Sequence, residues 1–278
     1  MKKKLLLSLG GLLLAVMAAL YLLADRYLIE HVELVVTPSP IAADTDGSAG
    51  GAEEDKSSGS IVKDDWNYAS DDISIAIREV QEGEGDDRIT YYVADVELSD
   101  LSSLSAAFAK NSFGRNIIEP TSAIAENNGA LFAINGDYYG FRDDGVIIRN
   151  GVLYRDEPVR DAMAIFRDGS VEIFNENSVA SRDLLARKVL HTYSFGPALV
   201  ADGKAKDGLD QVAIDTNFGN RSIEDANPRT AFGIIDSGHY LFIVVDGRSR
   251  GYSRGMTLNE LADLFVKLGA SEAYNLDG

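Results

Sequence analysis

Residues Asn227–Gly278 decide the fold, and they read NPRTAFGIIDSGHYLFIVVDGRSRGYSRGMTLNELADLFVKLGASEAYNLDG. Two runs of β-forming residues, Arg229–Ile235 and His239–Val245, flank a short Asp-Ser-Gly turn, so we predict an antiparallel hairpin. Pairing outward from this turn brings Arg229 close to Asp246. The hairpin is therefore expected to hold an arginine and a carboxylate together at its open end.

A polar loop with several glycines follows the hairpin and leads into an amphipathic helix. The loop begins at Gly247 and carries Arg248. Thr257 and Glu260 have the spacing of a capping box, and the apolar residues that follow share one helical face. A glycine ends the helix, and residues 273–278 then predict a short strand with a polar tip.

The residues upstream predict strands and helices without regular βαβ spacing. Strands are expected at Ile73–Ile77 and Ile89–Val96, and a continuous apolar run, Ala130–Ile134, is typical of a central strand. Short helices are expected over Leu101–Phe108 and Asp183–Leu190. The fold class is therefore α+β, with a mixed, largely antiparallel sheet and a few packed helices.

Three of the expected strands end in polar side chains, and such ends commonly form binding sites on a rigid scaffold. A single Asp-Gly pair is explained by turn chemistry alone, but the combination of three strand ends indicates a site. The candidate catalytic residues are Asp137, Arg229, Asp246 and Asp277. The candidate substrate-binding residues are Asn135, Gly136, Tyr138, Thr230, Gly247, Arg248 and Asn275.

Two further residues receive a structural interpretation. Asn150-Gly151 is a type I′ turn signature, so Arg149 beside it is expected to be solvated rather than catalytic. His191 is expected to be a hydrogen-bonded structural histidine.

The composition excludes several classes of function. A net charge of −18 does not fit a nucleic-acid surface, because phosphate binding needs a basic stripe. The chain has no cysteine and 3 histidines, which excludes thiolate metal sites and weakens zinc and Ser-His mechanisms. No cofactor is identified, and the metal question stays open: calcium or magnesium could bind the oxygens of several Asp and Asn residues.

The first part of the chain predicts a membrane anchor and a tether. Lys2–Lys4 precede the uncharged, mostly apolar run Leu5–Ala24, which is long enough to span a bilayer; a cleaved signal peptide is the alternative. We expect residues 1–26 to form a single-pass anchor in the cell membrane, with the N-terminus inside and the remainder outside. Residues 27–65 are rich in Pro, Gly, Ser and acids and predict a flexible stalk.

Residues 66–278 then form the folded domain, and their motifs resemble those of the phosphodiester glycosidase family. The stretches ALFAINGDYYGFRDDGVIIRNGVLYRD (130–156), SFGPALVADGK (194–204), PRTAFGI, VVDGR and GMTLNELADLFVKLGASEAYNLDG occur in the order of that family. The family pattern continues beyond NLDG into further glycines, so the domain is expected to be truncated at its C-terminus.

This resemblance implies hydrolysis of the glycosidic C–O bond of a sugar-1-phosphate diester of the N-acetylhexosamine type. The expected substrate is a glycan or sugar-phosphate polymer at the bacterial cell surface, as in exopolysaccharide. Such a reaction needs cations on the phosphate and a carboxylate near the anomeric carbon. Two alternatives remain: a metal-dependent phosphodiesterase acting at phosphorus, and a non-catalytic glycan-binding module in exopolysaccharide assembly.

Overall fold

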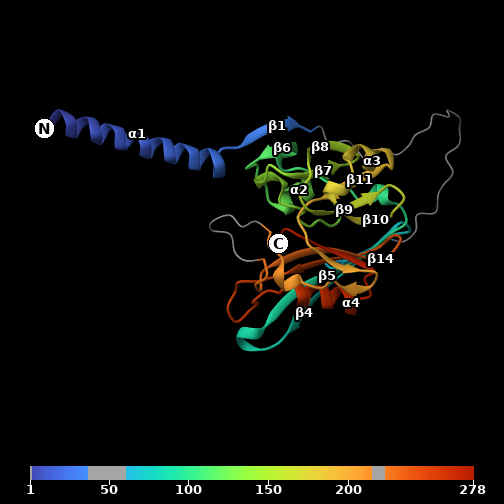
Figure 1. The fold of residues 1–278 in the computed structure, drawn as a ribbon. Helices are drawn as coiled ribbons and strands as arrows, with labels where there is room; N and C mark the ends of the chain where they lie inside the picture. Colours follow the sequence, from blue (N-terminus) through green and yellow to red (C-terminus); the bar gives the residue numbers. More distant parts are fainter. Residues whose placement is uncertain (1, 37–60, 215–222) are drawn as a thin grey trace.

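A nine-stranded antiparallel sheet forms the centre of the computed structural model, which describes residues 2–36, 61–214 and 223–278 (Figure 1). The order of its strands is β13-β12-β16-β14-β15-β5-β4-β3-β2. Their bounds are β2 (Val62–Lys63), β3 (Asn67–Ala69), β4 (Ile73–Glu82), β5 (Ile89–Leu98), β12 (Ala198–Ala201), β13 (Lys204–Ala205), β14 (Arg229–Asp236), β15 (His239–Val245) and β16 (Glu272–Leu276).

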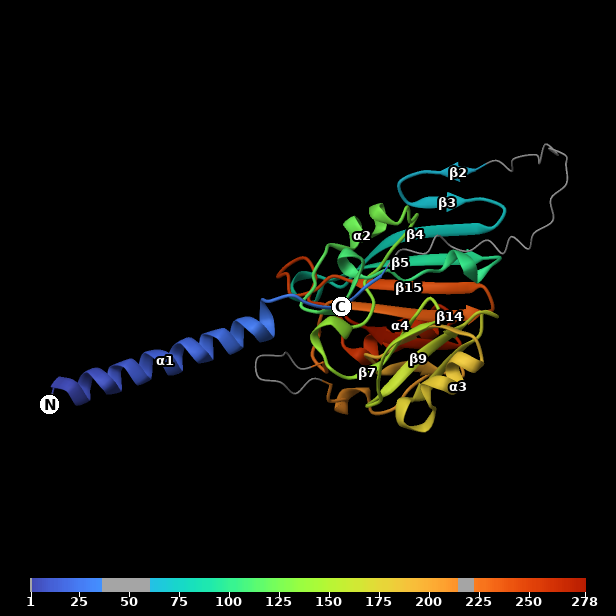
Figure 2. The same cartoon turned by 90° about the horizontal axis from the view of Figure 1, so that it is seen from above.

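Smaller sheets lie over one face of this sheet (Figures 1 and 2). They are a three-stranded sheet of β9 (Asp161–Phe166), β10 (Val171–Asn175) and β11 (Val189–Tyr193), the hairpin of β7 (Gly145–Arg149) and β8 (Val152–Glu157), and the pair β1 (His31–Val35) and β6 (Ser112–Arg115). The α-helices are α1 (Lys2–Tyr27), α2 (Thr121–Asn127), α3 (Ser181–Ala186) and α4 (Leu258–Lys267). This mixed, antiparallel architecture confirms the predicted α+β class.

The C-terminal hairpin and helix form as the sequence predicts. Arg229 pairs with Val245 across β14 and β15. The Thr257 hydroxyl accepts from the Glu260 main-chain N at 3.3 Å, and the Thr257 N donates to the Glu260 carboxylate at 2.9 Å, which completes the capping box of α4. These elements are predictable because their signals are local.

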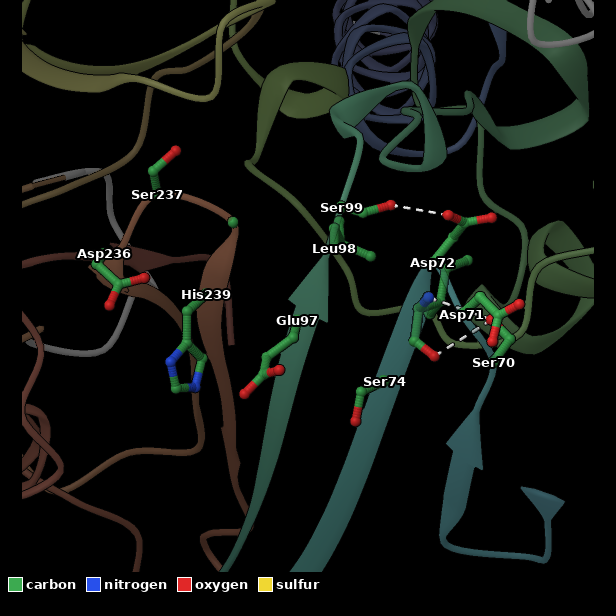
Figure 3. A pocket seen from close by; sticks show the side chains of 12 residues that line it. Ser70, Asp71, Asp72, Ser74, Glu97, Leu98, Ser99, Asp236, Ser237 and His239 are labelled. Atoms are coloured by element: carbon green, nitrogen blue, oxygen red, sulfur yellow. Dashed lines mark hydrogen bonds between the residues drawn. The ribbon is translucent and has the colours of Figure 1, made fainter. Parts of the chain in front are cut away.

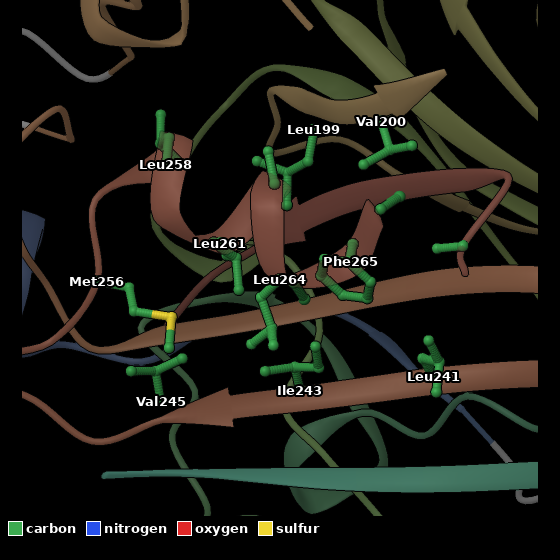
Figure 4. Packing of buried hydrophobic residues seen from close by; sticks show 14 of the residues in the cluster. Leu199, Val200, Leu241, Ile243, Val245, Met256, Leu258, Leu261, Leu264 and Phe265 are labelled. Carbon is green, nitrogen blue, oxygen red and sulfur yellow. The ribbon is translucent and has the colours of Figure 1, made fainter. Parts of the chain in front are cut away.

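Helix α4 covers one face of the central sheet (Figure 4). Its buried residues pack against the apolar side chains of β14, β15 and β5, and each fully buried Leu or Phe stabilises the fold by about 1.5–3 kcal/mol. Phe265 needs a glycine opposite it, because a Cβ on Gly233 would lie 2.5 Å from the Phe265 ring. The opposite face of the sheet packs against β9 and β11 through a second apolar cluster.

Three predicted elements differ in the structure. Ala130–Ile134 is not a strand: Phe132 and Ile134 pack against the core between the layers, but the segment forms no ladder with a neighbour. The predicted helix at Asp183–Leu190 ends at Ala186, because Val189 begins β11. Over Leu101–Phe108 only a 3-10 turn forms, Leu101–Ser103, capped by the Asp100 side chain.

The expected stalk, residues 27–65, is ordered at both of its described ends. Residues His31–Val35 form β1 and pair with β6, and Val62–Lys63 form the edge strand β2. The Asn116 amide also donates to the Ile29 carbonyl oxygen at 2.9 Å. The remainder of the expected stalk, residues 37–60, lies outside the described residues. Helix α1 is thus followed directly by a strand of the domain rather than by a free tether.

Candidate active site

Three chain segments meet at one end of the central sheet, as the sequence predicts. Thr230 on β14 pairs with Leu276 on β16, and its hydroxyl donates to the Asn135 Oδ1 at 2.8 Å. The Asn135 side-chain amide donates to the carbonyl oxygen of Asp277. The main-chain N of Asp277 in turn donates to the Gly136 carbonyl oxygen at 3.1 Å. Asn135, Gly136, Thr230 and Asp277 therefore form one hydrogen-bonded cluster.

Asp137 lies beside this cluster but is buried. Its side chain is 0% exposed and its Oδ1 lies 2.6 Å from Arg149 Nη2. Its Oδ2 accepts from the Ser194 main-chain N at 2.9 Å. A carboxylate held in this way orients the Asn135–Gly136 segment, and burial keeps it from direct contact with a substrate.

Arg149 is the residue that sequence reasoning missed, and its expected solvated position is wrong. Its side chain is 5% exposed, donates to the carbonyl oxygens of Ile148 and Thr192, and lies 4.5 Å from the centre of the Tyr193 ring. Burial by itself lowers the pKa of Arg149, but the hydrogen bond and attraction to Asp137, together with the nearby Tyr193 and Tyr139, outweigh it and leave the pKa above its usual value. The sequence near Arg149 predicts the turn that follows it, because a turn is a local feature. The contact between Arg149 and Asp137 depends on tertiary packing, so the local sequence does not predict it.

Arg229 points away from Thr230, because alternate residues of a strand face opposite sides of the sheet. Its Nε donates to the Met256 carbonyl oxygen at 2.9 Å, and its Nη2 donates to those of Ile223 and Asp225 at 2.6 and 2.8 Å. Among the described residues, no ion pair joins Arg229 to Asp246. Burial and the nearby Arg248 charge lower the pKa of Arg229 to about 10.

The loop after β15 presents Asp246 and Arg248. The Tyr252 hydroxyl donates to the half-buried Asp246 carboxylate at 2.8 Å. The exposed Arg248 donates to the Asn227 Oδ1 at 2.9 Å. Gly247 permits close approach of the two segments, because a Cβ there would lie 2.5 Å from the Pro228 N. Gly247 therefore has a structural role: it lets the loop pass close to Pro228.

Three other predicted residues lie around the cluster. Asn275 is 0% exposed, and its amide donates to the Gly196 carbonyl oxygen at 2.9 Å. Tyr138 stacks on Phe141 with ring centres 4.8 Å apart. His191 is buried with its Nδ1 3.3 Å from the Asn150 N and its Nε2 3.3 Å from the Leu104 carbonyl oxygen, which is the structural role expected for it.

A pocket of about 470 Å³ lies elsewhere, at the turn end of the β14–β15 hairpin (Figure 3). Its lining includes the acidic residues Asp71, Asp72, Glu97 and Asp236. The length of β15, about 20 Å, separates it from Asp246. This pocket therefore does not lie where the predicted chemistry gathers.

No group of three His, Cys, Asp or Glu side chains that could hold a metal ion occurs in the part of the chain that the structure describes. The carboxylates of Asp137 and Asp246 belong to separate hydrogen-bonded groups. A role for calcium or magnesium stays a prediction.

Comparison of the sequence with known proteins identifies the family of this chain. Residues 128–278, more than half of the chain, match the family described as phosphodiester glycosidase. The chain is 29% identical over 175 residues to the SPbeta prophage-derived uncharacterized protein YomE of Bacillus subtilis (strain 168). That match covers 60% of this chain and 26% of YomE, so the chain spans about a quarter of this relative's length.

Two solved structures share the fold. The catalytic domain of zebrafish N-acetylglucosamine-1-phosphodiester alpha-N-acetylglucosaminidase, auto-inhibited by its pro-peptide, aligns with a TM-score of 0.56 and 20% identity over 75% of this chain and 72% of that one. A hypothetical protein from Synechocystis aligns with a TM-score of 0.51 and 16% identity over 75% of this chain and 57% of that one. From the extent of the sequence match, the chain belongs to the phosphodiester glycosidase family.

Proposed function

We propose that this protein hydrolyses the glycosidic C–O bond of a sugar-1-phosphate diester of the N-acetylhexosamine type in a cell-surface or extracellular glycopolymer. The observation that carries the proposal is the placement of Asp246 and Arg248, directly after β15, and of Asp277, directly after β16, at one end of the central sheet. The β15, β14 and β16 strands are neighbours, so the main chains at Asp246 and Asp277 lie about 10 Å apart on either side of β14. β14 lies between them, so a substrate would have to lie across the end of this strand to reach both carboxylates.

Arg248 is the arginine that suits a phosphate, because its side chain is exposed. Arg229 is buried, and its Nε and Nη2 donate to main-chain carbonyl oxygens, so it supports the loop instead of meeting a substrate. A guanidinium also binds phosphate oxygens in a bidentate manner, which stabilises the charge that develops on a departing phosphate.

The carboxylates suit the sugar. A departing phosphate monoester needs little help from a general acid, so a carboxylate that stabilises the cation-like anomeric carbon matters most. Asp246 and Asp277 are the candidates, since both are partly exposed. Asn135, which accepts from Thr230, donates to the Asp277 carbonyl oxygen and so holds the main chain there. The buried Asp137–Arg149 ion pair, two residues along the chain from Asn135, holds this segment in place.

The expected location is a cell membrane. Helix α1 contains an apolar stretch, Gly10–Tyr27, that is long enough to cross a bilayer. Its lysines at the N-terminus favour an orientation with that end inside and the catalytic domain outside. In this arrangement the site meets extracellular glycans.

The test is hydrolysis by the full chain in detergent micelles. An aryl ester of N-acetylglucosamine-1-phosphate should be cleaved to free sugar, whereas an aryl N-acetylglucosaminide, which lacks the phosphate, should react at least 100-fold more slowly. Assays with EDTA and with added calcium or magnesium measure any dependence on metal. Absence of free sugar under every condition would contradict the proposed reaction.

A further inference from the structure

Three aromatic side chains form a row on the surface beside Asp246: Trp66, Tyr92 and Tyr252, here called the aromatic row. The rings of Trp66 and Tyr92 are stacked, with centres 6.3 Å apart and planes inclined by 11°. The hydroxyls of Tyr92 and Tyr252 lie 3.5 Å apart, and Tyr252 donates to Asp246. Trp66 and Tyr252 are 44% and 38% exposed, so the row is open to solvent.

The register of the sheet connects the aromatic row to the candidate active site. Tyr92 on β5 pairs with Val244 on β15, and Val244 pairs with Thr230 on β14. Paired residues project from the same face of a sheet, so Tyr92 and Thr230 face the same side. They are two strands apart, which is about 10 Å. The row therefore begins within one or two sugar rings of Thr230 and extends toward the edge of the sheet.

The chemistry of the row fits a sugar. The flat face of an aromatic ring packs against the C–H face of a pyranose, and the tyrosine hydroxyls can bond to its hydroxyls. Carboxylates border the row: Asp64 accepts from the Trp66 main-chain N at 2.7 Å, and Glu79 pairs with Tyr92 across β4 and β5. An anionic sugar would be repelled there, so the fitting ring is uncharged.

We propose that the aromatic row is a glycan subsite that stacks an uncharged pyranose next to the unit whose bond is cleaved. The inference rests on the proposed function for the position of the cleaved bond, but the stacking itself depends only on the row. It makes the substrate an extended glycan rather than an isolated sugar phosphate.

Trp66 is the sole tryptophan of the chain, so its fluorescence reports directly on the subsite. Titration of the full chain with a tetrasaccharide of N-acetylglucosamine should give a saturable change in that fluorescence. Tyr252→Ala should weaken binding about tenfold, equivalent to roughly 1.4 kcal/mol, because it removes one ring that would pack against the sugar. The matched variant Tyr252→Phe, which keeps the ring, should bind within about threefold of the wild type.

Kinetics separate this inference from the proposed function. Trp66→Ala should leave kcat/KM unchanged for the aryl ester of N-acetylglucosamine-1-phosphate but raise KM several-fold for the same ester extended by further sugars. Saturable binding of the tetrasaccharide without hydrolysis of either ester would contradict the proposed reaction but support the subsite. Hydrolysis of the small ester together with unchanged fluorescence, or equal KM values for Trp66→Ala and the wild type on the extended ester, would overturn the subsite.

Discussion

Asp137 and Asp246 both lie among the polar residues at the same end of the molecule, yet the structure gives them opposite environments. The Asp137 side chain is completely buried and held by Arg149 and the Ser194 N, whereas Asp246 is half-buried and held by one tyrosine hydroxyl. A buried ion pair supports the fold only while both charges remain. An accessible carboxylate is free to act on a substrate. Burial and partners, rather than residue type, therefore separate a positioning residue from a catalytic candidate.

The largest expected effect comes from breaking the buried pair. Arg149→Met leaves the Asp137 carboxylate buried without its charge partner, which should lower the free energy of unfolding by about 3–5 kcal/mol. Urea unfolding followed by circular dichroism measures this change. Arg182→Ala is the control, since the Arg182 side chain is 85% exposed and its loss should cost less than about 0.5 kcal/mol. Similar stability of the two variants would show that the pair does not support the fold.

The second effect is on catalysis without an effect on the fold. Asp246→Asn keeps an acceptor for the Tyr252 hydroxyl but removes the charge. Hydrolysis of the aryl ester should fall about 100-fold or more, a typical loss when one group that stabilises transition-state charge is removed, while urea unfolding stays unchanged. Full activity in this variant would place the essential carboxylate at Asp277 instead.

A smaller effect concerns pH. Burial, together with the charge of Arg149, lowers the pKa of His191 to about 4 from an ordinary value near 6.5. The unfolded chain therefore binds more protons at this residue than the folded chain between those values, so stability should fall as the pH drops from 6.5 toward 4.

The matched variant for this effect is His191→Gln, because an amide can accept from the Asn150 N and donate to the Leu104 carbonyl oxygen. Urea unfolding of both proteins at several pH values gives the two slopes. The slope of the variant should be shallower over this range. Parallel slopes would mean that His191 becomes charged as readily in the folded chain as in the unfolded one.

The same contrast explains how much of the molecule could be predicted from the sequence. The β14–β15 hairpin and α4 were predictable because a glycine turn, a capping box and an apolar face are local signals. The meeting of Asn135, Thr230 and Asp277 followed from strand ends, although the segment before Asn135 is not itself a strand.

The partner of Asp137 and the direction of Arg229 could not be predicted in this way. Arg149 reaches Asp137 in the folded chain, where its guanidinium lies over the Tyr193 ring, and no spacing in the sequence encodes that contact. Arg229 pairs with Val245 as expected, but successive residues of a strand face opposite sides of the sheet. The guanidinium of Arg229 therefore lies on the side of Met256 and not on the side of Thr230. Pairing predicts which residues are adjacent, while the face to which each points must be worked out separately.

The central claim is that the bond broken is the one between the anomeric carbon and the phosphate oxygen. Hydrolysis of the aryl ester of N-acetylglucosamine-1-phosphate in oxygen-18 water, followed by mass spectrometry of both products, tests this directly. The proposed reaction places the heavy oxygen in the sugar and leaves the aryl phosphate unlabelled. Label in the phosphate would show attack at phosphorus and contradict the proposed reaction.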